Sequence, residues 1–489
     1  MSIPNSIDYT SILPMAVESR VRRRGFVPSN GASFVSSQNN IIEIPVSASA
    51  FLDTRHSFLR MNLLNTTGVS LGVDFGGGAG IVNRLRILQG GTVLSDCREY
   101  GRLMSSIILP CQSTEDSLAT RSIKDGQRYG NAGGAGGAGG AAMAVALAAE
   151  TSGAAVNTPT NSVDATCAAA AGSNYTFSIP LMNGLLGTTQ DKLVPLFLLN
   201  SAPIVIEITL ARAEDIGIWG GALGGNGYTI NNVRYMASLV ETGPAVEDQI
   251  RMVQQASDGR LVLNGVDYSH QTGNVPAGTI GRINLPIPVR KKSIKSVLFV
   301  GASQTFLGGA GAQINKFNLS YGGHMNVGEY QLSFGSRRIP EVPIKFGDGT
   351  QADYSVLKSQ YLEELAKCFG DTKSAHGLGI MSRINNSIFS SAGATATMAV
   401  ASAAGAAMTP YRFCPFGIDC EAFQPDGKGG GALESGIDTA SSSTPLQLVL
   451  DIEIGPAVGP INTPAVVDMY VVHDSLYFID SVGNLRVAL

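Results

Sequence analysis

The chain has 489 residues and a formal net charge of −4, with 34 Lys and Arg against 38 Asp and Glu. This length predicts more than one domain, each able to bury its own core. The near-neutral balance excludes a globally basic nucleic-acid-binding protein, so any contact with DNA must be local. Charged residues make up only 15% while Gly supplies 59 residues. Such a composition is typical of many strands joined by turns, or of a surface hidden in an assembly.

Residues 1–35 are predicted to form an N-terminal arm, because turn residues are frequent there and apolar periodicity is weak. Residues 1–18 lack the basic start and apolar core of a signal peptide. The arm carries one basic cluster, which consists of Arg20, Arg22, Arg23 and Arg24. Two interpretations of this cluster stay open: a solvated tail, or an inward-facing arm that contacts DNA phosphates or lipid headgroups.

Apolar alternation predicts an all-β first domain over residues 36–245. The expected strands are 41–46, 58–64, 175–180, 193–199, 204–210 and 232–241. Asp96 is placed to cap a helix whose apolar face would comprise Tyr100, Leu103, Met104 and Ile107. Residues 131–172 consist almost wholly of Gly, Ala, Ser and Thr and cannot supply a core, so they are predicted to be an inserted loop.

The second domain, residues 261–489, is predicted to repeat the first after a linker at 246–260 that includes a brief helix. Residues 82–91 and 314–323 share a pattern of apolar, Asn, cation, apolar, polar and apolar residues that runs into Gly-Gly. Further matches follow in the same order: 44–46 with 287–289, 58–62 with 296–300, and 203–208 with 445–450. A helix at 353–369 and a second small-residue insert at 390–409 complete the parallel. Both Gly-Gly turns are therefore expected at equivalent places.

No motif in the chain predicts catalysis, a metal or a cofactor. The five histidines show neither HxH nor HExxH spacing, and no G-x-S-x-G elbow is present. The six cysteines show no CxxC or zinc spacing, so reduced thiols are expected. The glycine run at 133–140 lacks the context of a dinucleotide fingerprint. Acidic side chains near the predicted helix, which are Asp348, Asp353, Glu363 and Glu364, are explained by helix capping and solvent exposure.

Two tandem eight-stranded barrels, each with a helix and a loop inserted before its closing strands, resemble the double jelly-roll major capsid proteins of the adenovirus hexon lineage. The stretch from Leu193-Val194-Pro195-Leu196-Phe197 through 204–210 resembles late strands of the first roll in capsid proteins of polinton-like viruses and virophages. The ending at 467–474 and 479–485 resembles the closing hairpin of that group. The resemblance spans residues 35–489, and the long Ala/Gly insert departs from it.

The resemblance implies a protein without catalytic residues whose function is self-assembly. It implies trimeric pseudo-hexagonal capsomers, an icosahedral shell around a DNA genome, and location in the virion. Its partners would be further copies of itself, penton and minor capsid proteins, and genome DNA or internal lipid through the basic arm. Two other interpretations stay open: a two-domain jelly-roll carbohydrate-binding protein or glycan hydrolase, and an adhesin. The single tryptophan, Trp219, and the Gly/Ala-rich loops are atypical of a glycan hydrolase.

Overall fold

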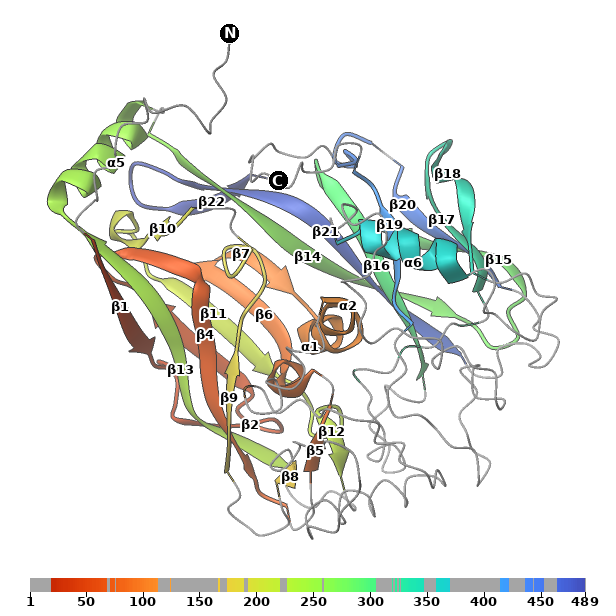
Figure 1. The fold of residues 1–489 in the computed structure, drawn as a ribbon, viewed down its shortest axis with the longest axis horizontal. Helices are drawn as coiled ribbons and strands as arrows, with labels where there is room; N and C mark the ends of the chain where they lie inside the picture. Colours follow the sequence, from red (N-terminus) through yellow and green to blue (C-terminus); the bar gives the residue numbers. More distant parts are fainter. Residues whose placement is uncertain are drawn as a thin grey trace, which may run out of the picture.

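The computed structural model shows a molecule of antiparallel sheets with a few short helices (Figure 1). It describes residues 19–67, 71–74, 76–112, 124, 166–167, 174–188, 192–219, 227–256, 259–304, 319, 322, 325, 327–346, 358–369, 414–421, 436–442, 444–452 and 464–488. The insert predicted at 390–409, nearly all of the insert at 131–172, and residues 1–18 lie outside this description.

The first half of the chain forms two sheets packed around one core. The larger sheet has the order β1 (Ser19–Phe26), β13 (Tyr228–Thr242), β4 (Phe51–Asn65) and β10 (Val194–Pro195), with β2 (Ser33–Val35) on β13 and β9 (Asn174–Ile179) on β4. The smaller sheet has the order β3 (Ile41–Val46), β11 (Ile204–Leu210), β6 (Val82–Gln89) and β7 (Thr92–Cys97). A separate small sheet joins β12 (Gly217–Trp219), β5 (Leu71–Val73) and β8 (Thr166–Cys167).

The second half has the same arrangement. One sheet has the order β14 (Leu261–Val275), β21 (Ala465–Ile479), β16 (Ile294–Ser303) and β19 (Phe416–Asp419), with β22 (Leu485–Ala488) on β21. The other has the order β15 (Gly281–Ile287), β20 (Leu446–Ile452), β17 (Val327–Phe334) and β18 (Arg337–Lys345). In the first half β1 pairs with the long last strand β13, and β3 pairs with β11. In the second half β14 pairs likewise with the long strand β21, and β15 pairs with β20. This is the strand order of a jelly roll, so the predicted fold of two tandem eight-stranded jelly rolls is confirmed.

Strand pairing gives the true correspondence between the rolls and corrects part of the predicted repeat. Ile204 lies opposite Gln89 in the first roll, and Leu446 lies opposite Phe334 in the second. These partners confirm the match of 203–208 with 445–450. The match of 44–46 with 287–289 was wrong by two residues. Ile204 and Leu446 are equivalent, and their strand partners are Val46 and Ile287, so Ile287 is equivalent to Val46 and not to residue 44.

The predicted equivalence of the two Gly-Gly turns was wrong. Gly90 and Gly91 join β6 to β7 with φ of 55° and 83°, a left-handed turn that suits glycine. The equivalent turn between β17 and β18 contains Gly335, with φ of 62°. Gly322 lies before β17 instead. An apolar alternation followed by glycines recurs throughout an all-β chain, so the pattern does not identify equivalent turns, and residues 314–323, apart from 319 and 322, lie outside the described residues.

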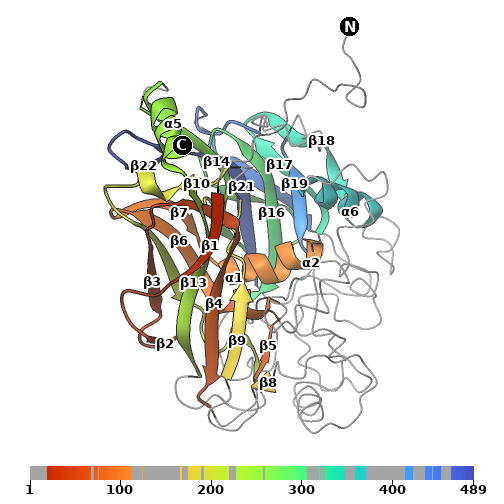
Figure 2. The same cartoon turned by 60° about the vertical axis from the view of Figure 1, so that its left-hand side comes forward.

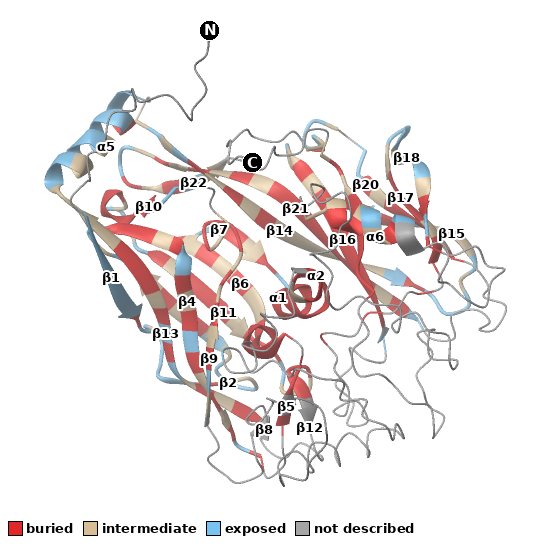
Figure 3. Cartoon of the chain, in the orientation of Figure 1, coloured by how far each residue is buried: buried red, intermediate tan, exposed pale blue. Residues whose placement is uncertain are grey.

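The predicted arm is a strand for part of its length. Residues 19–26 form β1, which pairs with β13 along eight residues, from Ser19 opposite Thr242 to Phe26 opposite Tyr235. Every β1 residue except Phe26 is exposed, and the strand lies at the edge of its sheet (Figures 2 and 3). Because neither face of β1 packs on a core, its sequence has no apolar alternation, and the pattern of the chain could not reveal the strand.

The helices and one strand also differ in detail from the expectations. The helix after Asp96 is confirmed, and it comprises α1 (Tyr100–Leu103), a π-helical turn (Met104–Ile108) and α2 (Leu109–Gln112). The predicted cap was wrong, because Asp96 lies in β7 and accepts hydrogen bonds from Arg84, while Glu99 is the residue that precedes the helix. The helix α6 spans Lys358–Lys367, and the linker contains α5 (Pro244–Ala256), which is longer than expected. The strand expected at 193–199 is a two-residue strand followed by a 3₁₀ turn (Leu196–Leu198). Pro195 has no N–H with which to continue a ladder.

Candidate functional site at the junction of the rolls

The two rolls meet across a buried ion pair. Arg102 of α1 donates from Nε to Oδ2 of Asp468 on β21 at 2.5 Å, and the two side chains are 2% and 5% exposed. His270 of β14 approaches the other carboxylate oxygen of Asp468 at 3.0 Å. Burial disfavours the charged form of Asp468, but Arg102 and His270 outweigh it and hold the pKa of this carboxyl below its ordinary value. The first roll thus supplies the cation for a carboxylate in the core of the second.

Further hydrogen bonds join the rolls on both sides of this ion pair. Gln89 donates to the carbonyl oxygen of Gly483 at 3.2 Å and accepts from the backbone N–H of Leu485 at 2.5 Å. The backbone N–H of Gly184 donates to the carbonyl oxygen of Val266 at 3.0 Å. Tyr470 donates to the carbonyl oxygen of Glu99 at 3.0 Å. Buried groups of this kind are costly to separate, because each would lose its partner. The two rolls therefore form one unit.

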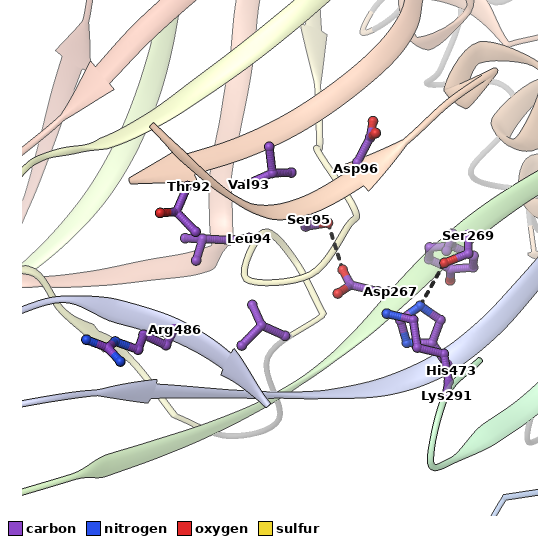
Figure 4. A pocket seen from close by; sticks show the side chains of 12 residues that line it. Thr92, Val93, Leu94, Ser95, Asp96, Asp267, Ser269, Lys291, His473 and Arg486 are labelled. Carbon is purple, nitrogen blue, oxygen red and sulfur yellow. Dashed lines mark hydrogen bonds between the residues drawn. The ribbon is translucent and has the colours of Figure 1, made fainter. Parts of the chain in front are cut away.

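A pocket of about 460 Å³ opens at the same junction (Figure 4). The first roll lines it with β7, from Thr92 to Asp96, and the second with the remaining side chains. These are Asp267, Tyr268 and Ser269 of β14, Lys291, His473 of β21, and Arg486 and Val487 of β22. The volume falls within the range of small-molecule sites, which often occur between domains.

Polar contacts inside the pocket fix several of its side chains. Asp267 accepts hydrogen bonds from Ser95 Oγ at 2.8 Å and from the Tyr477 hydroxyl at 2.6 Å. His473 Nε2 lies 2.9 Å from Ser269 Oγ. Burial, and then the nearby charge of Lys291, lowers the pKa of His473 to about 4. His473 is therefore uncharged at neutral pH.

The predicted basic cluster belongs to β1, which contributes no residue to the lining of this pocket. Arg22 forms an ion pair with Glu241 at 3.2 Å, with half of the Arg22 side chain exposed. Arg23 and Arg24 lie over the rings of Phe58 and Phe26, at 5.5 and 5.0 Å from the ring centroids. Alternation along a strand places Arg20, Arg22 and Arg24 on one side of the sheet and Arg23 on the other. The cluster is thus an exposed basic strand.

Sequence reasoning missed the pocket and the buried ion pair. Asp267, Lys291 and His473 stand far apart in the chain, each in or beside a different strand. No spacing rule links them, because pairing between β14 and β21 and the packing of β7 bring them together. Asp468 interrupts an otherwise apolar run at 465–472 of β21, which is the one signal that the sequence offers.

No group of three or more His, Cys, Asp and Glu side chains within the described ranges is arranged to hold a metal ion. No helix in that same part of the chain is long and apolar enough to cross a membrane.

The strand order and the fused junction define a double jelly-roll protein. Its structure is similar to that of PBCV-1 VP54 fitted into a cryo-EM reconstruction of the virophage Sputnik, with a TM-score of 0.57 and 11% identity over 98% of this chain and 99% of that one. It is also similar to the Faustovirus major capsid protein, with a TM-score of 0.56 and 7% identity over 95% of this chain and 91% of that one. No family model matches the chain. No curated protein matches it either. The likeness establishes the fold along nearly the whole length.

Proposed function

We propose that the chain is a major capsid protein, located in the virion, whose function is self-assembly. The observation that carries this proposal is the double jelly roll itself, which corresponds nearly end to end with the Faustovirus major capsid protein and with a chain of the PBCV-1 virus capsid. The fused junction supports it, because a shell subunit has to hold its two rolls in a fixed relation. Low charge suits broad contacts between subunits.

The capsomer would be a trimer. A chain with two similar rolls presents six rolls around a ring when three copies close with cyclic symmetry, and closed symmetry prevents growth into a filament. Such a pseudo-hexagonal unit tiles an icosahedral shell, here around a DNA genome. Penton and minor capsid proteins would complete that shell.

Negative-stain imaging of the purified chain tests this function. We expect particles with a pseudo-hexagonal outline, or shells built from them. A buried-junction variant, Arg102→Met, serves as the control, because loosening the rolls should blur the six-lobed outline. Uniform single-chain particles at micromolar concentration would contradict the proposal.

We also propose that the basic strand β1 contacts anionic cargo, either genome DNA or internal lipid, or an adjacent capsomer. This role is supported by the density of positive charge on β1, where four arginines stand within five positions and are exposed on an edge strand. One of them, Arg22, forms an ion pair with Glu241. The simpler explanation is that charges on an edge strand prevent aggregation by strand pairing.

A matched pair of variants separates these explanations. Replacing Arg20, Arg22, Arg23 and Arg24 with Ala removes four charges from β1. Replacing the exposed Arg60, Arg282, Arg290 and Lys292 with Ala removes four charges elsewhere. We expect only the first variant to reduce particle yield or DNA content while the capsomer stays folded. Normal particles with normal DNA content, or aggregation alone, would contradict a contact role.

A further inference from the structure

Lys295 lies at an irregularity in strand β16 of the second roll. Where β16 pairs with β21, Ile294 lies opposite His473 and Ser296 lies opposite Val472, so Lys295 is the extra residue of a β-bulge. A bulge changes the direction of a side chain, and bulges are common beside functional sites. The bulge therefore gives the Lys295 side chain a direction that regular pairing would not.

Two carboxylates from the flanking strands reach the Lys295 ammonium. Its Nζ lies 3.2 Å from Oε1 of Glu421, which follows β19, and 3.3 Å from Oδ1 of Asp474 on β21. The strand β16 lies between β21 and β19 in the sheet (Figure 1). Ser293 donates a hydrogen bond to Oδ2 of Asp474 at 2.7 Å, which leaves Oδ1 toward the amine. One carboxyl group can thus be attacked while the other accepts a proton.

The three charged side chains are largely removed from water. Lys295 is 14% exposed, Glu421 is 10% exposed and Asp474 is 13% exposed. The lysines of two other ion pairs, Lys345 and Lys367, are 53% and 42% exposed. Burying charges is costly even when they are paired, and a reaction with a neutral product removes that cost. The burial of this group therefore favours condensation of the amine with a carboxyl group.

We propose that Lys295 and Asp474 join in an intramolecular amide bond, with Glu421 as the group that carries the protons. Glu421 accepts a proton from the ammonium, and the freed lone pair of Nζ attacks the carboxyl carbon of Asp474. A C–N bond forms and a C–O bond breaks. The amide nitrogen keeps one of the three ammonium hydrogens, and the other two leave with one carboxyl oxygen as water. The opposite charges cancel, and no oxidant or co-reactant is needed.

Contact between the reacting groups explains how the bond forms without a second protein. Groups held in the correct geometry react as if at an effective concentration on the order of 10⁵ M or more. The bond ties β16 to β21, the strand that supplies Asp468 to the junction of the rolls. It fixes the second roll covalently whatever the chain assembles into, so this inference does not depend on the capsid assignment.

Mass spectrometry of the purified, denatured full-length chain tests the proposal. We expect a mass lower than that of the sequence by one water. Trypsin should then release peptide 293–316 joined to peptide 429–486, because the amide blocks cleavage after Lys295. This joined peptide distinguishes the amide from loss of water at another residue. A chain of full mass would overturn the proposal, and so would a bond from 293–316 to 413–428, the peptide that contains Glu421.

Three variants test the role of each group. Lys295→Met removes the nucleophile and Glu421→Gln removes the proton carrier, so both should keep the full mass of their sequences with an unchanged circular dichroism spectrum. Lys367→Met removes a more exposed lysine that lies 2.8 Å from Glu364, and its chain should still lose one water. Because the native chain is itself measured, the test stays decisive if a variant folds poorly. Loss of water in Glu421→Gln would overturn the role of Glu421.

Discussion

The buried pair of Arg102 and Asp468 makes the strongest prediction about stability. Arg102→Met removes the cation and leaves a carboxylate that is 5% exposed between the rolls, with His270 as its remaining partner among the described residues. Breaking a buried pair by removing one partner typically costs 3–5 kcal/mol, because the remaining charge stays uncompensated. We expect a loss of about 4 kcal/mol in the free energy of unfolding.

A double-mutant cycle measures the coupling. Arg102→Met, Asp468→Asn and the double variant are unfolded in guanidinium chloride at one fixed protein concentration, so that any assembly contributes equally. The double variant should lose less than the sum of the singles, by at least about 1 kcal/mol. The more accessible pair of Arg84 and Asp96, whose side chains are 29% and 28% exposed, is the control, and Arg84→Met should cost only about 1 kcal/mol or less.

A small loss of stability in Arg102→Met would contradict this prediction. If Arg102→Met costs no more than Arg84→Met, then water reaches Asp468 and the junction is not a buried unit. Strict additivity in the double variant would show equally that the two side chains act independently.

Three further predictions follow from single sites. Burial lowers the pKa of His473 to about 4, so the unfolded chain takes up this proton near pH 6.5 and the folded chain only at lower pH. Stability should thus fall by about 3 kcal/mol between pH 6.5 and 4, and His473→Gln should flatten that slope in unfolding curves measured across this range. Gly91→Ala should cost about 1–2 kcal/mol because of its positive φ, whereas Gly243→Ala, which meets no atom within 4 Å, should not. Cys97 and Cys111 are fully buried and burial raises the pKa of both thiols, so iodoacetamide should label them only after unfolding, as mass spectrometry would show.

The fold was largely predictable because alternation along buried strands is a direct consequence of packing. Ile42, Ile44 and Val46 alternate with half-exposed residues in β3, and the sequence shows that period. The edge strand β1 has no such constraint, so its arginines looked like a tail. The error over Gly322 has a different origin, since a Gly-Gly pair in the sequence does not show which turn of the fold it belongs to.

The junction was not predictable for a different reason. Arg102 and Asp468 are 366 positions apart, and a buried ion pair leaves no periodic trace in a single sequence. The lining of the pocket likewise depends on how β7 packs against β14, which is a property of the assembled rolls. Local patterns specify strands, whereas the contacts between domains arise only once both domains have formed.

The measurement that tests the central claim most directly is the mass of the purified full-length chain by light scattering. If the chain is a self-assembling capsid subunit with two fused rolls, the smallest stable species should have a mass near three times 50.9 kDa, or belong to particles built from that unit. A soluble species of 50.9 kDa that persists at micromolar concentration and does not assemble would contradict the account.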